Sequence, residues 1–271
     1  MSNIYGKGID VSSHNGEIKW SAVAKEIDFA IIRAGFGSGN IDQYAVHNIK
    51  ECERLSIPYG LYWFSYAYSI DMARKESEYL CNFADKYNPT LPLFFDYEYD
   101  SDKYAKLHCP LGVTDQMRYE FAMAFLNNVE KRGYFAALYS NIDYLNKGFR
   151  AITKRFALWL AEWGVSSPSV PCIFWQSTDS GKVNGISGKV DMNTAYKLFA
   201  GLHEETEKIT PTQLKEIQEI SEGIIEKYVA VAQAIIKGEY GNGEERKNKL
   251  KNAGYDYELA QGIVNYLLGI K

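Results

Sequence analysis

Leu91-Pro92-Leu93-Phe94-Phe95-Asp96-Tyr97-Glu98 is the most informative part of this chain, because an apolar run ends there in two carboxylates. Side chains alternate along a strand, so we expect Asp96 and Glu98 on one face and Phe95 and Tyr97 on the other. Two neighbouring carboxylates raise each other's cost of ionising, and apolar surroundings raise it further. Such a pair supplies a protonated acid beside a charged group, as the hydrolysis of a glycosidic bond requires.

A surface acidic cluster is the alternative interpretation of these carboxylates, since Asp100 and Asp102 continue the run and would solvate a loop. The rest of the chain bears on this choice. Up to about residue 200, short apolar runs alternate with helical patterns, which indicates parallel β/α units. Eight strands are expected, a number typical of a closed β/α barrel. They are Gly8–Val11, Asp28–Ala34, Pro58–Tyr66, Leu91–Glu98, Tyr134–Ser140, Phe156–Glu162, Cys172–Ser177 and Lys189–Asn193.

Helices are expected between these strands over Gln43–Leu55, Asp71–Tyr87 and Asp115–Lys131. Thr114 is the expected N-cap of the third helix, whose apolar residues recur at i, i+4. After Ser177 the chain becomes rich in glycine, which leaves no room for a helix between the last two strands. The predicted fold class is therefore α/β, an irregular, helix-poor β/α barrel of the TIM-like kind, followed by a small all-α helical bundle.

A polar stretch near residue 205 marks the expected domain boundary. Thr210-Pro211 suits an N-cap followed by proline at N1, and a long apolar stripe then runs from Leu214 to Ile235 and stops at Gly238. This stripe is longer than a lone bundle of this size needs, so its surplus face either packs against the barrel or pairs with a second copy, giving a homo-oligomer. The expected parts are a catalytic barrel at 1–203, a linker at 204–208 and a helical domain at 209–271.

Bulk composition excludes several classes of protein. The net charge of −4 over 271 residues argues against nucleic-acid binding. Four scattered cysteines lack metal-ligand spacing and indicate free thiols from a reducing compartment, so no metal and no cofactor is implied. No apolar stretch approaches the length of a membrane span, and the N-terminal residues lack an apolar signal region. We expect a protein made in a cytoplasm that binds no membrane.

Four acidic residues lie where a barrel active site is expected, at the carboxyl ends of the strands. Asp10 ends the first strand, Asp96 and Glu98 end the fourth, and Asp191 lies in the eighth. The first and eighth strands adjoin in a closed barrel, so Asp10 and Asp191 are expected side by side. Each acid alone could instead cap a turn or accept from loop amides. Four of them at one rim favour a catalytic site.

Seven short motifs carry a resemblance to the family 25 glycoside hydrolases, the Chalaropsis-type lysozymes. They are Gly8–Ser12, Ile31–Gly35, Pro58–Phe64, Asp96–Glu98, Leu158–Ala161, Phe174–Gln176 and Val190–Asn193. The resemblance covers roughly residues 5 to 200 and implies cleavage of the β-1,4 bond between N-acetylmuramic acid and N-acetylglucosamine. It also implies that Glu98 is the general acid and that Asp96 assists the developing cation or the acetamido group of the substrate. Asp10 and Asp191 are then the other acids of the site.

The resemblance extends to the walls of the site. It implies that Tyr62, Phe64, Trp159 and Trp175 line the sugar groove, and that Arg33 binds substrate or pairs with a carboxylate. A tryptophan in a barrel strand also suits the core, which is the alternative for Trp159 and Trp175.

Residues 238–265 resemble the short three-helix cell-wall-binding repeats of some phage lysozymes, which recognise the disaccharide-peptide unit of peptidoglycan. The candidate wall contacts are Tyr240, Asn242, Arg246 and Tyr255. Arg246 is the first of these, because a cation beside Gly241 suits a muropeptide carboxylate. Such repeats often come in tandem, whereas this chain has one copy. The alternative role of these glycines and tyrosines is turn formation and core packing.

The function expected from these features is that of a phage or prophage endolysin with muramidase activity on bacterial peptidoglycan. Its expected route is synthesis in the host cytoplasm without a signal peptide and action on the wall after release by a holin. A bacterial autolysin with the same chemistry is one alternative. A non-catalytic barrel whose acids only hydrogen-bond a glycan is the other, although a lectin has no need of a matched acid pair.

Overall fold

A computed structural model describes residues 4–109, 111–197, 199, 227–241, 243–257, 260–261 and 263–264. The chain falls into two compact units, Met1–Glu205 and Thr206–Lys271. The predicted linker at 204–208 and the first part of the long C-terminal stripe lie outside the described residues. Within the described ranges, no helix has the length and apolar character that crossing a bilayer requires.

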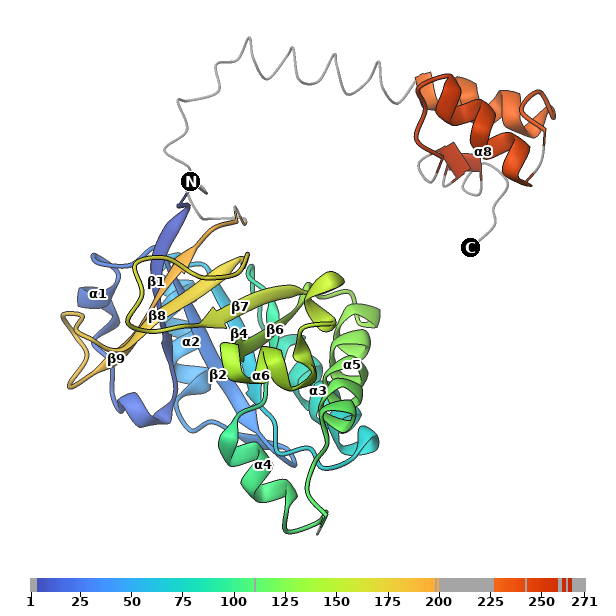
Figure 1. Ribbon diagram of the computed structural model, residues 1–271. Helices are drawn as coiled ribbons and strands as arrows, with labels where there is room; N and C mark the ends of the chain where they lie inside the picture. Colours follow the sequence, from blue (N-terminus) through green and yellow to red (C-terminus); the bar gives the residue numbers. More distant parts are fainter. Residues whose placement is uncertain are drawn as a thin grey trace. The chain divides into compact units, whose positions relative to one another are not determined.

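The strands of the first unit form a closed eight-stranded barrel (Figure 1). Its order is β1-β9-β8-β7-β6-β5-β4-β2, and pairing of β1 with β2 closes the ring. The bounds are β1 (Gly6–Val11), β2 (Phe29–Phe36), β4 (Tyr59–Phe64), β5 (Leu93–Asp96), β6 (Ala136–Asn141), β7 (Ala157–Ala161), β8 (Phe174–Gly181) and β9 (Val190–Ala195). A short strand, β3 (Asn40–Ile41), pairs with β2 outside the ring. The predicted α/β barrel is confirmed, with each expected strand in place.

The last strand departs from the predicted parallel arrangement, because β9 runs antiparallel to both β8 and β1. A parallel connection needs a crossover of a dozen or more residues, usually a helix, and the segment after β8 is too short for one. It turns back through Gly185 and Gly188, both at positive φ. Asp191 therefore lies at the start of its strand, and the register places it directly opposite Asp10.

Helices cover the outside of the barrel where the sequence pattern predicts them. The longer ones are α2 (Ala45–Leu55), α3 (Ile70–Ala84) and α5 (Asp115–Lys131). Thr114 caps α5, since its hydroxyl accepts from the backbone N–H of Met117 at 3.2 Å. Shorter segments are a 3₁₀ turn (Ser13–Asn15), α1 (Trp20–Val23), α4 (Tyr99–Ala105), α6 (Ile142–Tyr144), a π segment (Leu145–Phe149) and a second 3₁₀ turn (Ile152–Lys154).

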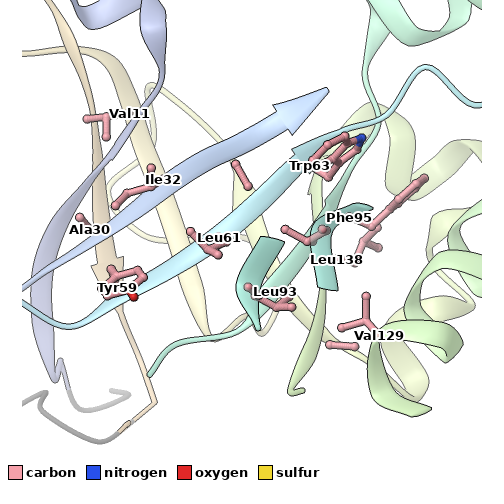
Figure 2. Close-up of a cluster of buried hydrophobic side chains, with 14 of the residues drawn as sticks. Val11, Ala30, Ile32, Tyr59, Leu61, Trp63, Leu93, Phe95, Val129 and Leu138 are labelled. Carbon is pink, nitrogen blue, oxygen red and sulfur yellow. The ribbon is translucent and has the colours of Figure 1, made fainter. Parts of the chain in front are cut away.

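Strand alternation divides the barrel core into two layers. Leu61, Leu93 and Phe95 point outward and pack with Val129 of α5 (Figure 2). Phe94, one residue before Phe95, points inward. It joins the second layer, in which the larger rings are Phe29, Tyr62, Phe94, Tyr139, Trp159 and Phe174. Burial of such rings is worth about 2–3 kcal/mol each. The barrel interior is therefore filled by aromatic rings, and polar side chains cluster above them at the carboxyl end.

The second unit is helical over residues 227–236 and in α8 (Gly243–Asn252). Its buried apolar side chains are Val231, Ala232, Ile235, Leu250, Ala260 and Val264. Gly238 and Gly254 follow the two helices with φ of 85° and 76°, a conformation that glycine adopts without a Cβ penalty. Gly238 lies where the apolar stripe predicts a helix to end.

Candidate active site

Asp96 and Glu98 lie on one wall of a cavity of about 340 Å³ at the carboxyl end of the barrel. The predicted strand through Glu98 is too long, because β5 ends at Asp96 and Glu98 is the residue before α4. The backbone of Glu98 is still extended, with φ of −132° and ψ of −170°, so the alternation continues. Tyr97 is accordingly buried on the opposite side, where its ring stacks at 6.1 Å from that of Phe95.

The other two predicted acids, Asp10 and Asp191, line the same cavity. The Oδ2 atom of Asp10 accepts from Nε2 of Gln176 at 2.9 Å and from Nδ2 of Asn193 at 2.7 Å. Nε2 of Gln176 also donates to Oδ2 of Asp191, at 3.3 Å. One amide therefore joins the two carboxyl groups.

Donors from the barrel wall orient both amides. Trp159 Nε1 donates to Oδ1 of Asn193 at 2.8 Å. The Tyr139 hydroxyl and Trp163 Nε1 donate to Oε1 of Gln176 at 3.1 and 3.3 Å. Because each amide oxygen already accepts, each amide N–H faces the acids.

The structure thus adds four polar residues that sequence reasoning did not single out: Tyr139, Trp163, Gln176 and Asn193. Strand alternation predicts that Gln176 and Asn193 face inward, since each lies two residues beyond an inward-facing position, Phe174 or Asp191. Each also lies inside one of the seven family motifs. Trp163 lies beyond the end of β7, in a loop where strand periodicity gives no information.

Burial and mutual repulsion favour the protonated forms of these acids. Burial raises the pKa of Asp96 well above its ordinary value, and the charges of Glu98 and Asp10 raise it further. The pKa of Asp10 is likewise raised by burial and then by Asp191. Burial also raises the pKa of Glu98, the Tyr139 hydroxyl beside it lowers this pKa, and the charges of Asp100 and Asp191 raise it further. The site therefore holds protons on some carboxyl groups that would be ionised in water.

One carboxylate oxygen stands out in this cluster. Oδ1 of Asp96 is buried and has no hydrogen-bond partner among the described groups. A buried polar atom without a partner costs about 1–3 kcal/mol, which a ligand with an N–H or O–H donor would recover. In its charged form, Asp96 therefore has an oxygen available to accept a hydrogen bond from a bound molecule.

The predicted aromatic wall is present in part. Tyr62, Phe64 and Trp159 line the cavity, and the rings of Tyr62 and Trp159 meet edge to face at 5.9 Å. Trp159 is 1% exposed and forms the floor of the site rather than an open platform. Trp175 does not line the cavity. Alternation turns it away from its neighbour Gln176, and its indole N–H donates to the backbone oxygen of Glu162 at 2.8 Å.

Arg33 lines the cavity and does have a carboxylate partner, which is Asp42 rather than one of the four acids. Its Nη2 lies 2.8 Å from Oδ2 of Asp42 and donates to the Ser13 hydroxyl, also at 2.8 Å. The same Asp42 oxygen accepts from the backbone N–H of Ser13 at 2.9 Å. This buried pair holds the loop after β1 against the rim of the barrel.

A second hollow of about 810 Å³ adjoins the first. Both are lined by Glu98, Tyr139, Gln176 and Asp191. The indole of Trp163, 51% exposed, and the ring of Tyr99, 49% exposed, form part of its wall. Glu98 therefore lies where two hollows meet, as a proton donor must when one sugar lies on each side of the bond to be cut. No metal-binding group of His, Cys, Asp or Glu occurs in the described ranges.

In the helical unit, the predicted wall contacts make internal interactions. Arg246 donates from Nε to the backbone oxygen of Gly241 and from Nη1 to Oε1 of Gln261, each at 3.0 Å. Tyr255 meets Tyr228 edge to face at 5.6 Å, and Tyr240 packs against the apolar core of the unit. Asn242 lies outside the described residues. These contacts fit the packing role that the sequence left open.

Paired carboxyl groups in a groove at the carboxyl end of a barrel are the arrangement that glycoside hydrolases use. Residues 9–186 match the family described as Glycosyl hydrolases family 25, and residues 230–268 match a CW_7 repeat. The chain therefore belongs to glycosyl hydrolase family 25, as the sequence motifs predict.

Similar proteins are lysozymes of bacteria and of a phage. Lysozyme M1 of Streptomyces globisporus is 29% identical over 69% of this chain and 66% of its own length. The lysozyme of Streptococcus phage Cp-7 is 25% identical over 95% of this chain and 68% of its own length. The bacterial lysozyme from Streptomyces coelicolor superposes with a TM-score of 0.62 at 27% identity, over 72% of this chain and 94% of that structure. The chain spans 55% of a further relative, the autolytic lysozyme of Clostridium acetobutylicum.

Proposed function

We propose that this family 25 enzyme is a peptidoglycan muramidase, which hydrolyses the β-1,4 bond between N-acetylmuramic acid and N-acetylglucosamine. The observation that carries the proposal is the position of Glu98, at the junction of two hollows and beside the buried Asp96. The lysozymes among its relatives support the choice of substrate.

Glu98 is the proton donor in this proposal. Burial raises its pKa, so a larger fraction of the carboxyl group holds its proton near neutral pH than would in water. The proton passes to the glycosidic oxygen as the bond from that oxygen to the anomeric carbon breaks. Glu98, now ionised, then takes a proton from the water that attacks the anomeric carbon.

Asp96 acts on the substrate rather than as a second acid. Its unpartnered Oδ1 accepts the N–H of the substrate's acetamido group, and the acetamido oxygen attacks the anomeric carbon as the leaving group departs. A hydrogen bond from the substrate favours the charged form of Asp96. Two attacks on the same carbon leave its configuration unchanged. Asp10 and Asp191, joined by Gln176, hold the opposite wall.

We further propose that the enzyme acts as a phage or prophage endolysin. It would be made in the host cytoplasm and reach the wall after holin-type release, with its C-terminal unit holding peptidoglycan. The match with the phage Cp-7 lysozyme over 95% of this chain supports this role. The similarity to an autolytic lysozyme keeps a bacterial autolysin as the second candidate, with the same chemistry.

Glu98→Gln tests the enzymatic proposal. Gln keeps the size and hydrogen bonds of the side chain but cannot give a proton, a role worth roughly 10²–10⁴-fold in rate. We expect the variant to lose clearing of a purified wall suspension and still to sediment with the walls. Glu78→Gln, an exposed change on α3, is the matched control and should clear at the wild-type rate. Clearing by Glu98→Gln at a rate near wild type would remove Glu98 from the mechanism.

A further inference from the structure

The helix that follows Glu98 is held by polar contacts more than by an apolar face. Helix α4 has seven residues, and its buried side chains are those of Ser101 and Ala105. Figure 1 shows α4 at the rim of the barrel, away from the layer of α3 and α5. So small an apolar area stabilises a helix only slightly, and seven residues are too few for a stable helix on their own. Ring contacts of Tyr99 with Tyr144 at 5.2 Å and of Tyr104 with Tyr66 at 4.9 Å add to this small area, and polar contacts must supply the rest.

Asp102 of α4 supplies them, through four hydrogen bonds. Its Oδ1 accepts from the Tyr97 hydroxyl at 2.9 Å and from Nε of Arg118 at 3.1 Å. Its Oδ2 accepts from Nη2 of Arg118 at 2.8 Å and from the Tyr144 hydroxyl at 2.9 Å. The side chains of Asp102 and Arg118 are 18% and 11% exposed, and Tyr97 and Tyr144 are 1% exposed. A carboxylate with this many donors and little solvent is held in one geometry.

The same segment fixes Glu98. Its backbone N–H donates to the Ser101 hydroxyl at 3.0 Å, and its backbone oxygen accepts from the N–H of Asp102 at 3.1 Å. Tyr97, the residue before it, is bonded to Asp102 as well. None of Tyr97, Asp102, Arg118 and Tyr144 lines either hollow, so this cluster acts on substrate through its neighbours: Glu98, and Tyr99 of the same helix, whose ring lies 5.2 Å from that of Tyr144.

We propose that Asp102, clamped by Arg118, Tyr97 and Tyr144, is a positioning residue that holds the proton donor Glu98 at the junction of the two hollows. The inference rests on the proposed function, since that is what makes Glu98 the proton donor. Arg118 comes from α5 and Tyr144 from α6, so the position of the proton donor depends on two side chains that do not themselves line either hollow.

Asp102→Asn tests the proposal. Asn keeps the shape but loses the charge, and its amide N–H₂ faces donors, so at least one bond of the cluster breaks. On soluble peptidoglycan oligosaccharides we expect kcat to fall by about 10- to 100-fold, with KM within about threefold, because a misplaced donor affects the transition state more than binding. Asp115→Asn is the control, since it removes the exposed partner of the same arginine, and it should keep the wild-type kcat.

The pH profile separates positioning from a merely structural role. The groups facing Glu98 are Asp96, Asp100, Tyr139 and Asp191, and none of them is changed. Burial is what raises the pKa of Glu98, so a loosened α4 admits water and lowers it. Because the donor must be protonated, the alkaline limb of kcat/KM should move to lower pH in Asp102→Asn. A loss of folded enzyme alone would lower the amplitude and leave the limb in place.

Two further measurements keep the test decisive. Tyr144→Phe removes one donor to Asp102 and should shift the limb in the same direction by a smaller amount. The carboxyl ¹³C signal of Glu98, assigned by its absence in Glu98→Gln, reports the same pKa without turnover. If the wild-type chain cuts no glycan, the proposed function fails, and this signal still decides the positioning. An unchanged Glu98 pKa in folded Asp102→Asn, or in Tyr144→Phe if Asp102→Asn does not fold, overturns the inference.

Discussion

Glu76, a buried acid behind the active site, should make the stability of the barrel depend on pH. Its side chain is fully buried in α3. Oε1 accepts from the backbone N–H of Tyr66 at 2.9 Å, and Oε2 lies 2.5 Å from the Ser65 hydroxyl. The backbone N–H of Ser65 in turn donates to the backbone oxygen of Asp96 at 2.7 Å. Burial raises the pKa of Glu76 to about 8, more than these hydrogen bonds lower it.

The sign and size of the effect follow from this pKa. An unfolded glutamate titrates near about 4.3, so between about pH 4.3 and 8 the folded chain holds a proton that the unfolded chain has released. The stabilisation is complete below pH 4.3 and declines as pH rises, until it is lost above pH 8. At about 1.4 kcal/mol per pH unit, the free energy of unfolding should lose up to about 5 kcal/mol over this range.

Glu76→Gln should remove this dependence. The amide is neutral at every pH, keeps an oxygen for the N–H of Tyr66 and can donate to the Ser65 hydroxyl. We expect variant and wild type to unfold at similar urea concentrations at pH 5. At pH 8 the variant should be more stable by several kcal/mol, an upper bound being about 5 kcal/mol. Tryptophan fluorescence reports urea unfolding at each of the two pH values. The other acids of the site are the same in both proteins, so their contributions cancel in the stability difference between variant and wild type.

The control is Glu78→Gln, an exposed change two residues further along the same helix. It should leave the stability difference between pH 5 and pH 8 as it is in the wild type. If Glu76→Gln also runs parallel to wild type at both pH values, the carboxyl group does not hold its proton in the folded state. The reasoning from burial would then be refuted.

Three further predictions concern the chemistry and the two units. Early NMR spectra of the product should show the β-anomer at the new reducing end, because acetamido assistance retains configuration; initial α-anomer would mean inversion, with Asp10 or Asp191 as the base. Residues 1–203 alone should cut walls without a strong hold on them, and residues 209–271 alone should sediment with walls without cutting; a C-terminal fragment that stays in solution would instead act in packing or dimerisation. Arg246→Ala should lower the melting temperature of that fragment, because it removes the bonds to Gly241 and Gln261; an unchanged melting temperature together with lost wall binding would restore Arg246 as a ligand contact.

Local pattern predicts much of this structure. The strand count and the three longer helices follow from periodicity and caps, since each depends on residues close together in the chain. The clustering of the four acids is predictable because the carboxyl ends of the strands in a barrel share one rim. The antiparallel direction of β9 follows from its short connection to β8. The length of this connection is visible in the sequence, but the repeating β/α pattern before it predicts a parallel strand. Trp175 lies outside the cavity because strand alternation turns it to the face opposite Gln176, which does line the cavity.

Other features depend on contacts that sequence periodicity does not show. The sequence alone favours an exposed loop acid at Asp102, because its partners Arg118 and Tyr144 lie 16 and 42 residues away. Asn193 meets Asp10 across 183 residues. Such pairs form only because the barrel closes, so their chemistry becomes visible once strand order and register are known.

Reducing-end analysis of digested peptidoglycan identifies which glycosidic bond the enzyme cuts. Purified walls are treated with the full chain, with Glu98→Gln as the blank, and the new ends are reduced with borohydride, hydrolysed and identified as amino sugar alcohols. If the enzyme is a muramidase that uses Glu98, the wild-type chain releases muramitol and the Glu98→Gln digest contains none. New ends on glucosamine instead, or equal release by the two proteins, would contradict this assignment.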